Sequence, residues 1–94
     1  MSKVVKVTEE MKELAHVVET DDGKFYVVST VHLPLDTHAE TMVFSWDKED
    51  DCVANWDDKL CCRYKSYAEA VNYHDDICTH LEGYLDGSYP PEED

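Results

Sequence analysis

His74 and Cys78 are the two residues whose types and spacing come closest to a chemical site. Four residues apart on a helix, an imidazole and a thiol lie on one face and can chelate a metal ion. A second candidate group, Asp36, His38 and Glu40, lies close together in a predicted loop. Zinc needs about four ligands, or three at a catalytic site, and neither group shows zinc-finger spacing. We therefore expect no native metal and no cofactor, with a small metal-binding protein kept as an alternative.

On this expectation His74 is a hydrogen-bonded core histidine, and the three loop residues are solvated. A catalytic cysteine activated by a histidine is a further possibility, with Cys78 paired to His74 or Cys62 paired to His32. A reactive thiolate needs electropositive surroundings, whereas 22 Asp and Glu against 8 Lys and Arg give this chain a net charge of −14. The sequence also has no G-x-S-x-G motif, and its 3 glycines form no phosphate-binding loop. We expect a protein that is not an enzyme.

The net charge of −14 indicates what the chain can bind. Such a surface repels nucleic acid and anionic membranes and attracts basic protein surfaces. No stretch approaches the ~20 apolar residues of a membrane span, and Glu9 and Glu10 come before any signal-peptide apolar region. The four cysteines form no C-x-x-C pair, which favours reduced thiols. We expect a cytoplasmic protein whose partner is a basic protein surface, with no direct nucleic acid and no membrane.

Carboxylates held on a rigid surface can imitate phosphate groups and occupy the basic groove of another protein. Trp56 lies among acidic residues and has two readings: a buried core aromatic, which is the commoner case in small domains, or an exposed interface anchor. The residues expected to contact a partner are Asp47, Glu49, Asp50, Asp51, Trp56, Asp57, Asp58, Asp75 and Asp76.

Alternating apolar residues predict the strands that must position these groups. Asp21-Asp22-Gly23 is a hairpin signal, because glycine accepts the positive φ of the turn. It predicts paired strands at about 14–20 and 24–33, although residues 8–20 also fit a helical stripe. The second of these strands is apolar on both faces, which indicates a central strand. A third strand is predicted at 41–47, with Met42, Phe44 and Trp46 pointing inward and Thr41 pointing outward. We then expect an acidic connection over 47–58 and a fourth strand at 59–65.

The C-terminal segment predicts a helix. Ser66 and Glu69 form a capping box, and Gly83 and Gly87 mark the end. The apolar stripe consists of Tyr67, Ala70, Val71, His74, Cys78, Leu81 and Leu85. We predict a single α+β domain over residues 1–87, with a small antiparallel sheet of about four strands and one helix on a face. Residues 88–94 form a polar acidic tail that we expect to be mobile.

Three strings in the chain occur in a fixed order: VSTVHLPLD at 28–36, ETMVF at 40–44 and RYKSYAEA at 63–70, the last followed by His74. Together they resemble a family of small phage and prophage proteins, over roughly residues 26–80. The chain departs from that pattern at residues 37–39, where relatives carry a Gly/Pro-rich insertion, and at Tyr73, where they have glycine. The resemblance implies a phage-like origin and carries no implication about catalysis.

Charge and resemblance together predict a non-enzymatic acidic phage or prophage protein. It would bind a basic host or phage protein as a nucleic-acid mimic that inhibits a host defence or DNA-handling enzyme. The alternative is a structural or assembly accessory that acts through its sheet edge or helix, which also allows a homodimer.

Overall fold

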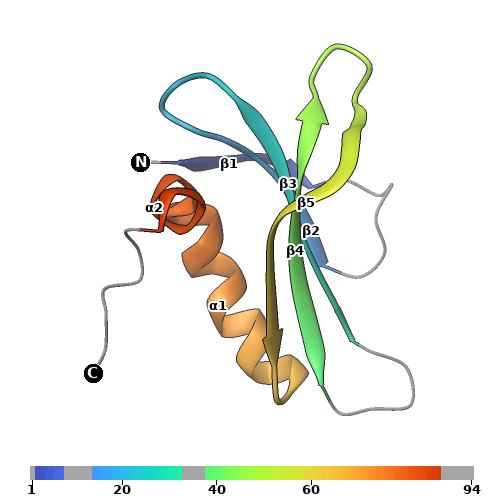
Figure 1. Ribbon diagram of the computed structural model, residues 1–94, viewed down its shortest axis with the longest axis vertical. Helices are drawn as coiled ribbons and strands as arrows, with labels where there is room; N and C mark the ends of the chain where they lie inside the picture. The colour runs from blue at the N-terminus through green and yellow to red at the C-terminus, as the bar shows by residue number, and fades with distance from the viewer. Residues whose placement is uncertain (1, 8–13, 33–37, 88–94) are drawn as a thin grey trace.

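The computed structural model describes residues 2–7, 14–32 and 38–87. Within these ranges the chain forms five strands and two helices: β1 (Lys3–Val7), β2 (Leu14–Glu19), β3 (Phe25–His32), β4 (Ala39–Asp47), β5 (Cys52–Tyr64), α1 (Tyr67–Thr79) and α2 (Leu81–Asp86). The strands pair antiparallel in the order β1-β2-β3-β4-β5, and the helices lie on one side of the sheet (Figure 1). The α+β prediction is confirmed, with five strands where about four were expected.

The β2–β3 hairpin has the predicted turn. Gly23 adopts a φ of 82°, in the left-handed region that glycine enters without a steric penalty. Backbone bonds of 2.9 Å join Thr20 N to Lys24 O and Gly23 N to Thr20 O. β3 is the central strand of the five, as its two apolar faces predicted.

β5 is one strand of 13 residues, so the predicted acidic connection over 47–58 is wrong. The link between β4 and β5 is a short turn in which Asp51 N donates to Asp47 O at 2.7 Å. The pairing then jumps from Ser45↔Asn55 to Val43↔Leu60, so residues 56–59 form a bulge. A bulge breaks the two-residue alternation of a strand, and exposed charged residues within it resemble a loop in the sequence.

β1 was not predicted, because its sequence lies next to a segment with ambiguous periodicity. It pairs with β2 through Lys3↔Glu19 and Val4↔Val18. The preceding residue, Ser2, is buried. Its Oγ donates to Cys78 O at 2.6 Å and accepts from Leu81 N at 2.9 Å. This hydroxyl therefore satisfies backbone groups at the junction of α1 and α2.

The serine half of the predicted capping box is present at the start of α1, whereas the Glu69 side chain binds the amide of Lys65, one residue before the Ser66 cap. Ser66 Oγ accepts from Glu69 N at 3.2 Å, and Glu69 Oε1 accepts from Lys65 N at 3.4 Å. The single predicted helix is interrupted at His80, whose φ of −119° and ψ of 36° are not helical. α2 ends at Gly87, whose φ of 85° gives the left-handed cap expected from the sequence.

Apolar clusters lie on both faces of the sheet. The cluster beneath the helices consists of Val18, Val28, Val43, Ile77, Cys78 and Leu81. The cluster of the opposite face consists of Ala15, Val17, Val27, Phe44 and Trp46. Phe44 and Trp46 are buried as predicted, but Thr41, predicted to point outward, is fully buried on the helix side. The error follows from assuming that only one face of β4 is covered.

Candidate functional site

Buried polar side chains form a continuous hydrogen-bonded line between α1 and the sheet. His74 is only 1% exposed. Its Nδ1 shares a 2.8 Å hydrogen bond with Thr30 Oγ1, which in turn lies 2.6 Å from Thr41 Oγ1. On its other side, His74 Nε2 shares a 2.8 Å hydrogen bond with His16 Nδ1. Four elements, β4, β3, α1 and β2, are linked by this line.

Strand alternation explains why these groups meet. Thr30 and Thr41 are directly paired across β3 and β4, so their side chains leave the same face of the sheet. His16 and Val18 lie two residues apart on β2, so they also share a face, and Val18 packs in the cluster beneath the helices. His74 reaches this face from the buried stripe of α1.

His74 is neutral at physiological pH. Burial, followed by the neighbouring His16, lowers the pKa of His74 to about 4, although Asp75 opposes the change. A neutral imidazole has one donor and one acceptor, which matches the two hydrogen bonds of the ring. His74 is therefore the hydrogen-bonded core histidine expected from the sequence.

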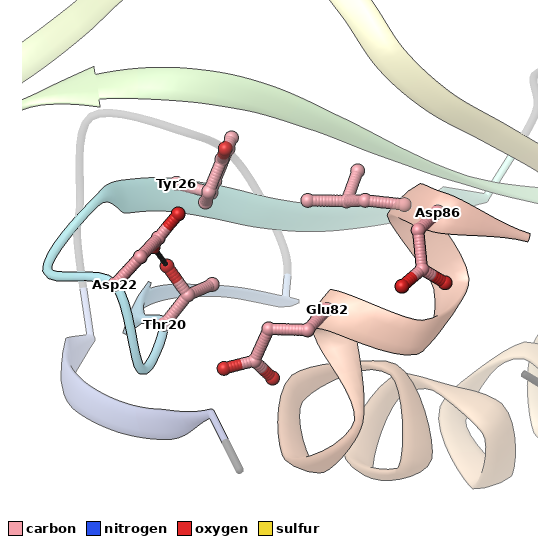
Figure 2. Close-up of a pocket in the computed structure, with 6 residues that line it drawn as sticks. Thr20, Asp22, Tyr26, Glu82 and Asp86 are labelled. Atoms are coloured by element: carbon pink, nitrogen blue, oxygen red, sulfur yellow. Dashed lines mark hydrogen bonds between the residues drawn. The ribbon is translucent and has the colours of Figure 1, made fainter. Parts of the chain in front are cut away.

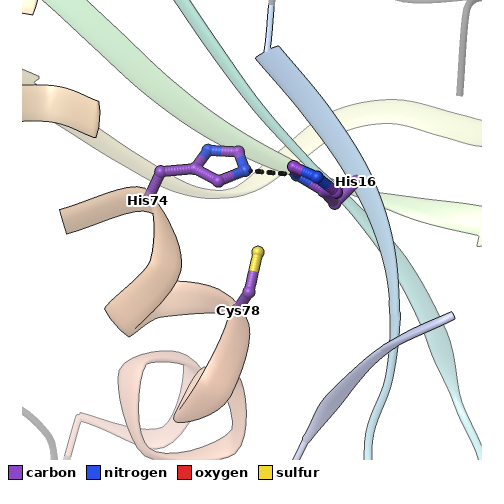
Figure 3. A group of neighbouring side chains, drawn as sticks. All are labelled: His16, His74 and Cys78. Atoms are coloured by element: carbon purple, nitrogen blue, oxygen red, sulfur yellow. Dashed lines mark hydrogen bonds between the residues drawn. The ribbon is translucent and has the colours of Figure 1, made fainter. Parts of the chain in front are cut away.

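Cys78 lies one helical turn after His74 and is 2% exposed. One ligand atom from each of His16, His74 and Cys78 lies within 4.8 Å of the others (Figure 3). Burial raises the pKa of the Cys78 thiol to about 12, with a further contribution from Asp75. The thiol is thus protonated at physiological pH. All four cysteines are free.

The other metal-binding and nucleophile candidates from the sequence lie outside the cluster of His16, His74 and Cys78. Glu40 pairs with Arg63 at 3.4 Å, and His38 is partly buried next to β4. Asp36, the third member of that loop group, lies outside the described residues. His32 lies edge-on to Tyr67, with ring centroids 6.1 Å apart. His16 was not predicted as part of the site. Its position two residues before Val18 in a predicted strand nevertheless indicated that the two side chains share one face of the sheet.

The β4–β5 hairpin carries most of the predicted partner-binding residues, in its turn and on the β5 bulge. Asp47 Oδ1 accepts from Glu49 N at 2.9 Å and from Asp50 N at 3.0 Å, which holds the turn in shape. Glu49, Asp50 and Asp51 are exposed there, as are Asp57 and Asp58 on the β5 bulge. We call these six residues, Asp47, Glu49, Asp50, Asp51, Asp57 and Asp58, the hairpin acids.

Trp56 lies on the same bulge and is 63% exposed, so the expectation of a buried tryptophan is wrong. Its ring meets Phe44 edge-on, with centroids 5.1 Å apart. The bulge explains the exposure, because residues 56–59 leave the paired ladder that would have placed this side chain on a covered face. Trp56 is therefore an apolar side chain on the surface, next to Asp57 and Asp58.

Asp75 and Asp76 lie apart from the hairpin acids, on α1 (Figure 1). Asp75 is exposed. Asp76 accepts a 2.7 Å hydrogen bond from Tyr84 of α2 and lies 3.9 Å from His80 Nε2, so it also joins the two helices. The predicted acidic residues thus form two groups on different elements.

A pocket of about 280 Å³ opens between the β2–β3 turn and α2 (Figure 2). Its lining consists of Thr20, Asp22, Tyr26, Glu82, Leu85 and Asp86. Glu82 Oε2 accepts from Asp21 N at 2.6 Å, which ties the turn to the helix. A hydrogen bond from Thr20 lowers the pKa of Asp22, so this carboxylate stays ionised. The sequence analysis missed the pocket because its two sides come from distant segments.

Comparison of the chain with protein-family models, with curated proteins and with solved structures finds no match. None of the described helices is long and apolar enough to cross a membrane.

Proposed function

We propose that this protein binds a basic protein through the hairpin acids and Trp56, in the manner of a small acidic phage or prophage protein. The exposure of Trp56 next to Asp57 and Asp58 carries the proposal. Interface hot spots are enriched in tryptophan, and a ring that becomes buried on binding supplies affinity that charge alone does not. The surrounding carboxylates select a cationic partner.

The charge distribution supports the same partner class. With a net charge of −14, the chain attracts cationic surfaces over a distance set by ionic strength. Lys24 and Arg63 form ion pairs with Asp22 and Glu40, at 3.9 and 3.4 Å. Lys48, within the β4–β5 turn, lies 5.2 Å from the centre of the Phe25 ring.

The hairpin is a stable platform for such contacts. Two backbone amides bind Asp47 Oδ1, and the β4–β5 ladder anchors the turn on both sides. Carboxylates fixed in this way lose less conformational entropy on binding than those of a flexible segment. A nucleic-acid mimic that occupies the groove of a DNA-handling enzyme is the specific form of this function that we propose.

Assembly through the β5 edge of the sheet finds less support than the acidic surface. Pairing through the β5 edge would require a regular row of unpaired backbone groups. The bulge at residues 56–59 and the exposed charges of Asp57 and Asp58 interrupt that row. Both features are ones that natural proteins use against edge-to-edge pairing.

Affinity capture from host lysate tests the proposal. Immobilised protein should retain a basic partner, and retention should weaken measurably as the salt concentration increases from dilute to physiological buffer. The variant Asp57→Asn/Asp58→Asn should lose the partner. The matched control, Asp75→Asn/Asp86→Asn, removes the same charge from exposed helix positions and should retain it.

Three results would count against the proposal: recovery of no basic partner, retention that is indifferent to salt, or equal losses in the two variants. The last result would mean that net charge alone, and no particular surface, governs binding.

A further inference from the structure

The cluster of His16, His74 and Cys78 has the composition and geometry of a metal site. One nitrogen from each histidine and the thiol sulfur lie within 4.8 Å of one another (Figure 3). Around a tetrahedral zinc ion, with Zn–N of about 2.0–2.1 Å and Zn–S of about 2.3 Å, ligand atoms stand roughly 3.3–3.6 Å apart. The observed His16–His74 separation of 2.8 Å is a hydrogen-bond distance and would have to open by roughly half an ångström, whereas ligand atoms near the 4.8 Å limit of the cluster would have to close by roughly 1 Å.

We propose that His16, His74 and Cys78 bind one Zn²⁺ ion at the interface of α1 with the sheet, with water as the fourth ligand. Two imidazoles and a thiolate suit a borderline-soft divalent ion, whereas Mg²⁺ and Ca²⁺ require oxygen ligands. The i,i+4 spacing of His74 and Cys78 supplies two ligands from one helix face, and β2 supplies the third. This inference is independent of the acidic surface.

The polar line beneath His74 serves as the outer shell of the site. A zinc-bound imidazole uses one nitrogen for the metal and donates its other N–H to a fixed acceptor, which sets the ring orientation. Thr30 Oγ1, 2.8 Å from His74 Nδ1, is placed to be that acceptor, and its own proton can go to Thr41 at 2.6 Å. His74 Nε2 then faces His16 with its lone pair available.

The ends of the binding elements are also held in place. Ser2 Oγ bonds the carbonyl of Cys78 at 2.6 Å and the amide of Leu81 at 2.9 Å, so the last turn of α1 is tied to the N-terminal segment. His16 is only partly buried, so its ring can move to open the site. Fixed ligands on the helix and one adjustable ligand on the strand allow entry without unfolding the interface.

Binding exchanges one set of interactions for another. The ion replaces the His16–His74 hydrogen bond, so the proton that His16 Nδ1 donates in that bond must move through solvent to His16 Nε2, which leaves the Nδ1 lone pair for the metal. The Cys78 thiol proton leaves to solvent as the sulfur–metal bond forms. Zinc affinity should therefore increase with pH.

Cobalt is the probe that reports sulfur ligation directly. Reduced, metal-free protein titrated with Co²⁺ should develop a thiolate-to-cobalt charge-transfer band that saturates at one ion per chain. Zn²⁺ should abolish the band and raise Tm, because it binds only the folded chain. His16→Gln should weaken Co²⁺ binding by at least on the order of 10-fold, because loss of an outer-shell partner alone already costs that much and His16 is a direct ligand.

Variants of the other thiols keep the test specific. Cys78→Ser should remove the band, whereas Cys61→Ser/Cys62→Ser, which changes one exposed and one partly buried thiol on β5, should retain it. Circular dichroism confirms that each variant is folded. No band at stoichiometric Co²⁺ in folded protein, survival of the band in folded Cys78→Ser, or its loss in the β5 variant would each overturn the proposal.

Discussion

Replacing Thr30 by valine tests the buried hydrogen-bonded line most sharply. Valine has nearly the same shape as threonine, so the change removes a hydroxyl without opening a cavity. Thr30 is fully buried, and its hydroxyl is bonded both to His74 Nδ1 and to Thr41 Oγ1. The substitution therefore deprives two other buried polar groups of a partner.

Each orphaned group costs ~1–3 kcal/mol, and the added buried methyl returns ~1 kcal/mol. We expect Thr30→Val to lower the free energy of unfolding by about 3 kcal/mol, and Tm by on the order of 15 °C. Urea denaturation followed by circular dichroism measures the change in metal-free protein at neutral pH. Thr41→Val is the matched control, because it leaves the bond between Thr30 and His74 intact and should cost about 1 kcal/mol.

The double variant makes the test depend on differences in the free energy of unfolding between variants, and not on the absolute cost of each substitution. With both hydroxyls gone, only His74 Nδ1 lacks a partner, so Thr30→Val/Thr41→Val should be no less stable than Thr30→Val alone. A Thr30→Val protein as stable as Thr41→Val would refute the reasoning. So would strict additivity of the two single changes.

Three further outcomes are expected. The pKa of His74 falls from 6.5 to about 4 on folding, so the unfolded chain binds the proton more readily between those pH values. The resulting stability is fully present above pH 6.5, and acidification to pH 4 should lower the free energy of unfolding of metal-free protein by up to about 3 kcal/mol. Denaturation midpoints compared across pH should show this loss in the unsubstituted protein and not in His74→Gln. Ser66→Ala should cost about 1 kcal/mol in urea denaturation, since it removes the acceptor for Glu69 N, whereas the exposed Asn72→Ala should cost little. Trp56→Ala should weaken capture of the basic partner while changing stability by less than about 1 kcal/mol, because the ring is 63% exposed; a large stability loss would contradict a surface role.

The features predicted from sequence are those that neighbouring residues determine. The Asp-Asp-Gly turn fixes the β2–β3 hairpin through one residue at positive φ, and the Ser66–Glu69 box fixes the start of α1. Both depend on bonds between residues at most four apart. Bulges defeat such reasoning, because the extra residues of β5 disturb the alternation while the strand itself continues.

The candidate sites depend on contacts between residues far apart in the sequence, which explains why His16 and the pocket were not predicted. His74 and Cys78 could be paired from their helical spacing, but His16 lies 58 residues from His74 and meets it only through the antiparallel pairing of β2 with β3 and the packing of α1. The acidic pocket similarly joins a turn near residue 22 to α2. The exposure of most of the hairpin acids could be anticipated, since charge predicts exposure wherever the segment lies.

The contact of Ser2 with Cys78 bears on the order in which the chain folds. Every strand pairs with its sequence neighbour, so most of the sheet can form through short loops, a topology associated with rapid folding. The Ser2 hydroxyl, in contrast, reaches across 76 residues to the helix junction, a closure that becomes favourable only once the meander and α1 are in place. The sheet and α1 can thus form early, and the Ser2 hydrogen bonds form late. Loss of the Ser2 hydrogen bonds would therefore increase the unfolding rate more than it would decrease the folding rate.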